Sequence, residues 1–182
     1  MGDPKKQKKK YETPRFPWRS DMLGDELRLL GEYGLRSKKE LGRHRTMLSK
    51  FRGTARSLLS MSAAERAKPE AQFLGRLKRL GILSEDAALD NVLDLAMEEL
   101  LERRLQTLVL RKGLSTTMAQ SRQLITHGHI SIEGRKMFSP SYLVPREKET
   151  EIAYAPTSPL ASPEHPLREV IEAEASGGEP VE

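Results

Sequence analysis

The sequence predicts an α+β fold: a helical N-terminal region with an extended basic arm, followed by a small domain of two helices packed on a short antiparallel β-sheet. Three observations predict it. Apolar residues recur at helical spacing through most of residues 41–126. After Gly128 the spacing of apolar residues shortens to every second residue, as in a β-strand. A lysine-rich segment opens the chain. With 182 residues and no cysteine, the chain can bury a core but has no disulfide and no cysteine-based zinc site.

Residues 1–40 are predicted to form the extended basic arm. The first twenty of them combine a lysine run with two prolines, and such a segment cannot bury enough apolar surface to fold alone. We expect it to become ordered against a partner, with Tyr11, Phe16 and Trp18 available for stacking. An unstructured solubilising tail is the alternative.

The sequence also indicates where the protein resides. No apolar run approaches the ~20 residues that a membrane-spanning helix needs. The N-terminal lysines are not followed by an apolar stretch, so they do not form a secretory signal. We therefore expect a cytoplasmic protein without a membrane partner.

Residues 41–100 are predicted to form a helical region. The stretch "RTMLSKFRGTARSLL" places its apolar residues on one helical face. Pro69 is expected to begin a second helix, which Gly81 ends. Ser84 is expected to cap a third helix that continues to Leu100.

Three arginines follow the edge of the first apolar face. Arg45, Arg52 and Arg56 are separated by seven and four residues, which brings them within ~40° of one another on a helix. Guanidinium groups bind phosphate oxygens through paired hydrogen bonds, so this ridge suits the backbone of RNA or DNA. Intramolecular ion pairs are the alternative, but acidic residues are scarce in the same stretch.

Residues 101–154 are predicted to form the small domain, which starts with two helices. The first runs from Leu101 and stops at Gly113. Thr117 can cap the second, with a glutamine three residues later in the position of a capping box, and Gly128 ends it.

Short strands complete this domain. Apolar and polar residues alternate from Ile130, and Glu133 and Gly134 make a tight turn into the next strand. Further short strands are expected near residues 142–144 and 152–154. The resulting sheet is antiparallel.

Charge alternates in blocks along the chain. The balance of Lys and Arg against Asp and Glu is +9 over residues 1–56, −4 over 57–102, +7 over 103–148 and −7 over 149–182. Concentrated positive charge attracts a polyanion, usually nucleic acid, although solvated charged surface is the alternative. Residues 155–182 are predicted to be an acidic, disordered tail, which RNA would repel.

The stretch "SRQLITHGHISIEGRKM" gathers two histidines, a glutamate and a lysine. Zinc needs about four converging ligands, whereas here His127 follows a helix and His129 begins a strand. Neither an HExxH motif nor a GxxxxGK[ST] loop occurs in the chain. We expect no catalytic residue, no metal and no cofactor, and we interpret both histidines as structural or RNA-contacting.

The stretches "LERRLQTLVLRKGL", "SRQLITHGHI" and "SPSYLV" resemble the family of small-subunit ribosomal protein four, in its archaeal and eukaryotic branch. The resemblance is close over residues 101–146 and implies that the small domain is the RNA-binding domain named after that family. One departure is Glu133, where many members turn the hairpin with Asn. The RNA contacts that the resemblance implies are Arg103, Arg104, Thr116, Thr117, Gln120, Arg122, Gln123, His127, His129 and Lys136.

The resemblance implies a non-enzymatic, structural constituent of the small ribosomal subunit. Such a protein binds and organises the 5′ region of small-subunit ribosomal RNA during assembly, supports translational accuracy and contacts neighbouring ribosomal proteins, protein five among them. One alternative is a free-standing RNA-binding or ribosome-associated factor, but such factors tend to lack a long basic arm. The other is a fragment of an RNA-modifying enzyme, although no catalytic motif is present.

Overall fold

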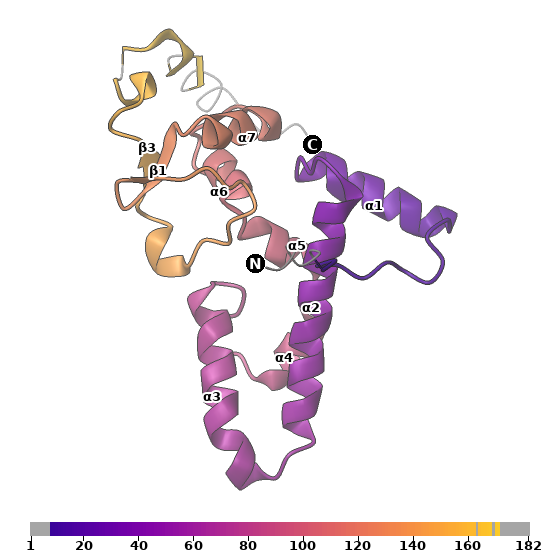
Figure 1. The fold of residues 1–182 in the computed structure, drawn as a ribbon. Helices are drawn as coiled ribbons and strands as arrows, with labels where there is room; N and C mark the ends of the chain where they lie inside the picture. Colours follow the sequence, from indigo (N-terminus) through magenta and orange to yellow (C-terminus); the bar gives the residue numbers. More distant parts are fainter. Residues whose placement is uncertain (1–7, 163, 169, 172–182) are drawn as a thin grey trace, which may run out of the picture.

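The computed structural model describes residues 8–162, 164–168 and 170–171. It confirms the α+β class, with helices in the N-terminal part and a small α+β domain after them (Figure 1). The small domain lies beside the N-terminal end of the long helix α2, while the other end of α2 extends away from it together with α3.

The helices of the N-terminal part are α1 (Ser20–Glu32), α2 (Lys38–Leu59), α3 (Ala63–Arg79), α4 (Leu89–Asp94) and α5 (Met97–Glu102). Helices α2 to α5 share one core in which Ala55 of α2 and Leu77 of α3 are completely buried. The rings of Phe51 and Phe73 meet edge to face, 6.3 Å between their centres. The predicted apolar face of α2 is therefore the one that packs.

The small domain contains α6 (Leu105–Arg111), α7 (Met118–Thr126), β1 (Ile130–Ile132), β2 (Arg135–Lys136) and β3 (Ile152–Tyr154), with 3-10 helices η1 (Arg146–Lys148) and η2 (Pro159–Ala161). The sheet is antiparallel in the order β2-β1-β3. Leu105 and Val109 of α6, Ile125 of α7 and Ile130 of β1 form its core. Two helices thus pack on a short sheet, as predicted.

The predicted hairpin turn at Glu133 and Gly134 is present. Ile132 lies opposite Arg135, so the loop between the strands has two residues. Both loop residues have positive φ, 53° at Glu133 and 73° at Gly134, as a type I′ turn requires. This conformation is unfavourable for a glutamate side chain.

The extended arm is shorter than the predicted residues 1–40. α1 begins at Ser20 and α2 at Lys38, so among the described residues only 8–19 precede the first helix. Leu29 of α1 packs in a small core with Leu41 and Leu101, and this tertiary packing stabilises a helix that local periodicity did not reveal. The other predicted domain limits, at residues 100 and 154, stay predictions.

Four further local predictions are wrong. The helix expected to begin at Pro69 begins six residues earlier, at Ala63, and contains Pro69. The helix expected from Ser84 begins only at Leu89, and the chain leaves the helical conformation between α4 and α5. The helix expected from Leu101 is interrupted before α6, where Arg104 instead forms an isolated β-bridge with Leu143. The strand predicted for residues 142–144 is reduced to this single bridge at Leu143.

The acidic tail predicted to be disordered over residues 155–182 starts as ordered structure. Ala155, Ser158 and Leu160 are buried, and Leu160 belongs to the core of the small domain. The prediction is therefore wrong for this beginning of the tail. Residues 172–182 lie outside the described residues.

Candidate nucleic-acid interface

A buried ion-pair cluster joins the two parts of the molecule. Glu40, in the first turn of α2, accepts hydrogen bonds from Arg104 Nη2 at 3.2 Å and from Arg122 Nη2 at 2.7 Å. The Arg104 side chain is completely enclosed. Burial by itself would raise the pKa of Glu40, but the hydrogen bonds and charges of Arg122 and Arg104 outweigh it and hold this pKa below its usual 4.5.

Two predicted RNA contacts are used inside this cluster. Arg104 has no exposed side-chain surface, so the prediction that it contacts RNA is wrong. Arg122 directs donors to both Glu40 oxygens and keeps a quarter of its side chain exposed. A third predicted contact, Arg103, donates to Glu149 at 2.7 Å and to the carbonyl oxygen of Val144 at 3.0 Å.

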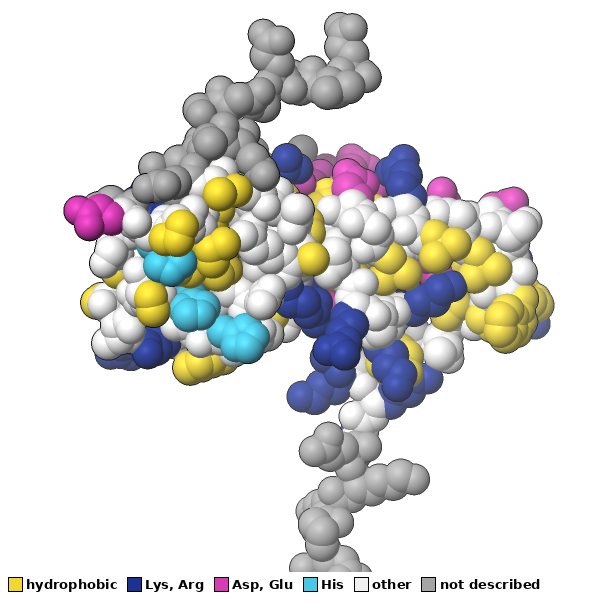
Figure 2. Space-filling view, turned by 90° about the horizontal axis from the view of Figure 1, so that it is seen from above, with side chains coloured by type: hydrophobic (Ala, Val, Ile, Leu, Met, Phe, Trp, Pro, Cys, Tyr) yellow, Lys and Arg dark blue, Asp and Glu magenta, His cyan; other side chains and the backbone are white. Residues whose placement is uncertain are grey.

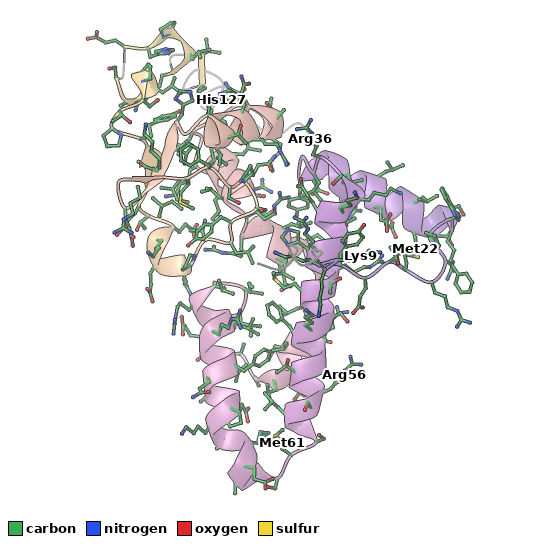
Figure 3. All side chains as sticks on the ribbon, in the orientation of Figure 1. Lys9, Met22, Arg36, Arg56, Met61 and His127 are labelled. Carbon is green, nitrogen blue, oxygen red and sulfur yellow. The ribbon has the colours of Figure 1, made fainter. Side chains whose placement is uncertain are left out.

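The predicted arginine ridge on α2 is also partly paired. Arg45, Arg52 and Arg56 line one shallow pocket, as the spacing predicted. However, Arg45 lies 3.3 Å from Glu26 of α1, and Arg52 donates to the carbonyl oxygen of Leu95 at 2.7 Å. Arg56 is exposed and forms no ion pair with a described residue; in Figure 3 it lies on the side of α2 away from α3.

A second basic surface on α2 was missed by sequence reasoning. A groove of about 550 Å³ has a floor that includes Met47 and Phe73, and four cationic side chains line it: Lys10, Arg43, Lys50 and Arg76. None of the four forms an ion pair within the described chain. We call this the cationic groove. The seven-residue spacing of Arg43 and Lys50 indicates a shared helical face, but Lys10 and Arg76 join them only through the fold.

The polar residues predicted to contact RNA at the start of α7 form hydrogen bonds that cap this helix. Thr117 caps it by accepting a hydrogen bond from the Gln120 N–H at 3.1 Å, as predicted. In a capping box the Gln120 side chain would accept a hydrogen bond from the N–H of Thr117. Here its Oε1 accepts instead from the N–H and the hydroxyl of the preceding residue, Thr116, at 2.7 and 2.8 Å. These side chains therefore have a structural task, whatever else they contact.

The remaining predicted contacts lie at the other end of α7 and on β2. Gln123, His127 and Lys136 are exposed, and Figure 3 shows His127 beside the end of α7. His129 is half-buried, with Nδ1 2.8 Å from the Ser158 hydroxyl. Gln123, His127 and His129 share a pocket of about 470 Å³ with Pro159, Leu160, His165 and Leu167.

The basic and histidine-bearing surfaces lie on the same side of the molecule. Figure 2 shows Lys and Arg side chains gathered in the middle of one face, with His side chains farther along that face over the small domain. A strand of nucleic acid that crosses this face meets both surfaces. Arg43 and Lys50 of the cationic groove are exposed and available to phosphates, and the pocket beside α7 offers polar side chains.

Two other kinds of site are absent from the described part of the chain. No group of three or more His, Asp or Glu residues there is arranged to hold a metal ion. No described helix combines the length and the apolar character needed to cross a membrane.

Comparisons with known proteins identify the small domain and its relatives. The S4 domain family matches residues 103–149. Three curated relatives are each called small ribosomal subunit protein uS4. The relative from Metallosphaera sedula is 52% identical over 161 residues, 88% of this chain and 89% of its own length. The relatives from Hyperthermus butylicus and Methanococcus aeolicus are 53% and 50% identical, and the alignments cover 88% and 92% of this chain and 92% and 96% of theirs.

Proposed function

The chain belongs to the uS4 family of small ribosomal subunit proteins, and from that premise we propose that it binds and organises the 5′ region of small-subunit ribosomal RNA during assembly. A member of this family is a structural constituent of the small subunit and carries an RNA-binding S4 domain. Its role is structural rather than enzymatic.

The observation that carries the proposal is the cationic groove. Arg43, Lys50 and Arg76 are exposed, and no described carboxylate neutralises them, so their charge is available to phosphates. Binding would release counterions condensed on the RNA, which makes affinity fall as salt rises. Because the bases of an RNA duplex are hidden in its deep groove, this surface would recognise the shape and backbone of folded RNA.

Protein neighbours are part of the same proposal. Phe16 is 60% exposed and Trp18 is 87% exposed, both on the arm before α1. Both rings are therefore available to pack against a partner. We propose that neighbouring small-subunit proteins, protein five among them, contact this chain in the cytoplasmic ribosome and that its position supports translational accuracy.

Sedimentation of a cell lysate tests the assignment. We expect one copy of this chain per small subunit, measured by quantitative mass spectrometry of gradient fractions. Recovery far below one copy per subunit would contradict it and favour a free-standing factor or an RNA-modifying enzyme. Chemical probing of the ribosomal RNA, with and without the protein, tests the 5′ region: protection confined to other regions would contradict that part.

A further inference from the structure

We propose that the pocket beside α7 accepts a single unstacked nucleobase of an RNA strand, an inference that rests on the proposed RNA-binding function. One wall is formed by α7 and the residues after it, with Gln120, Gln123, His127 and His129. The opposite wall is formed by four residues after β3, namely Pro159, Leu160, His165 and Leu167. We call this the base pocket.

The second wall is held firmly against the small domain. Leu160 is 96% buried in the core, and its N–H donates to the Ser158 hydroxyl at 3.2 Å. The same hydroxyl lies 2.8 Å from His129 Nδ1, and the N–H of Ala155 donates to the carbonyl oxygen of His129 at 2.7 Å. These bonds tie the segment to the start of β1. The base pocket is therefore formed before any ligand arrives.

The lining differs from that of a typical phosphate site. Its described residues include neither Lys nor Arg, whereas the cationic groove is lined by four. What it offers instead are two carboxamides and three imidazoles, from Gln120, Gln123, His127, His129 and His165. Such groups pair with the neutral donors and acceptors on the edge of a base.

The shape of the base pocket fits a flat, partly apolar group. Leu124, Leu160 and Leu167 give it apolar contact surface, and its volume of about 470 Å³ lies in the range of sites that enclose small molecules. The His127 and His129 rings are stacked, 6.4 Å between centres and 30° between planes. Imidazole faces are among those on which unstacked RNA bases pack.

The position of the base pocket suits an RNA strand whose phosphates are already bound by Lys and Arg side chains. The His side chains and the basic cluster lie on one face (Figure 2). An RNA strand whose phosphates bind these Lys and Arg side chains can therefore direct one of its bases into the base pocket. An apolar side chain of a protein partner is the competing occupant, and a lack of preference for the base-bearing RNA in the experiment below would favour it.

The experiment uses the full chain and two single-stranded heptanucleotide RNAs. One carries 2-aminopurine at its central position, and the other carries an abasic ribose there. We expect the base-bearing probe to bind about tenfold more tightly, with quenching of its fluorescence as the base stacks. His127→Ala and Gln123→Ala should each remove most of that preference while leaving the affinity for the abasic probe unchanged. Both side chains are exposed, so folding should not be affected.

Controls separate the base pocket from the wider function. Thr126→Ala, next to His127 but not part of the lining, should leave the preference intact. Equal affinity for both probes, binding to neither, or a preference that survives both substitutions would overturn the inference. If an rRNA transcript still binds the chain in a salt-dependent way, the proposed function stands and only the base pocket fails. If the transcript does not bind, the proposed function fails as well.

Discussion

The S4 domain and helix α2 are both rich in positive charge, yet they use it differently. Nine Lys and Arg residues lie in the S4 domain, and six of them pair with carboxylates: Arg103, Arg104, Arg111, Arg122, Arg146 and Lys148. Helix α2 carries seven, of which only Lys38 and Arg45 pair with a described carboxylate, Glu26 in both cases.

This difference assigns separate tasks to the two regions. In the S4 domain most of the positive charge is paired with carboxylates, and the pocket beside α7 is lined by neither Lys nor Arg. On α2 and the arm, positive charge is exposed and available. The net charge of a segment is therefore a weaker indicator of RNA binding than the pairing of its individual cations. A Lys or Arg that pairs with a carboxylate is less available to phosphates.

The largest expected effect comes from removing the carboxylate at the junction. Glu40→Ala leaves Arg104 buried without a counter-charge and Arg122 without its main acceptor. Breaking a buried pair in this way should lower the free energy of unfolding by about 3–5 kcal/mol, measured by urea denaturation. Glu85→Ala is the control, because its pair with Arg146 is exposed and should contribute less than about 1 kcal/mol. Equal effects of the two changes would show that the junction is not stabilising.

A pH effect of intermediate size should come from His44 of α2, which lies beside the same junction. Burial, together with the charge of Arg104, lowers the pKa of His44 from 6.5 to about 4. Since this pKa is lower in the folded state, the unfolded state binds the proton first, and stability falls as pH decreases from about 6.5 toward 4. At pH 5 the loss should reach roughly 2 kcal/mol relative to pH 7.

The variant His44→Gln isolates this contribution, because glutamine does not titrate. Unfolding free energies measured at pH 7 and pH 5 should differ by about 2 kcal/mol less in the variant than in the natural chain. The same pH dependence in both proteins would show that His44 is not responsible.

The smallest effect is expected in the hairpin of the S4 domain. Glu133 has a φ of 53°, which asparagine tolerates better, and it forms a half-exposed ion pair with Lys148 at 2.7 Å. Glu133→Asn should relieve more strain than the ion pair contributes, raising stability by about 0.5 kcal/mol in thermal or urea unfolding. Gly134→Ala, at a φ of 73°, should destabilise instead. If the asparagine variant is less stable than the natural chain, the ion pair is the stronger term.

The features that sequence predicted are those set by nearby residues. The Thr117 cap, the two-residue turn at Glu133 and Gly134, and the apolar face of α2 each depend on a few neighbouring positions. Local preferences and periodicity are enough to reveal them.

The features that sequence missed depend on distant residues. Glu40 is 64 residues from Arg104 and 82 from Arg122, so nothing in the local pattern showed that these arginines were already paired. The cationic groove likewise joins Lys10 and Arg76 to α2 only after the helices pack. The buried start of the tail, with Leu160, was hidden by its proline- and serine-rich composition.

The salt dependence of RNA affinity tests most directly whether α2 and its neighbours, rather than the S4 domain, neutralise the phosphates. The measurement compares the triple variant Arg43→Ala, Lys50→Ala, Arg76→Ala with a matched triple in the S4 domain, Arg111→Ala, Arg146→Ala, Lys148→Ala, on a transcript of the 5′ region of small-subunit rRNA. The first triple should reduce the slope of log affinity against log salt by roughly 2–3, and the second by less than about 1. A larger reduction from the S4-domain triple would contradict the account.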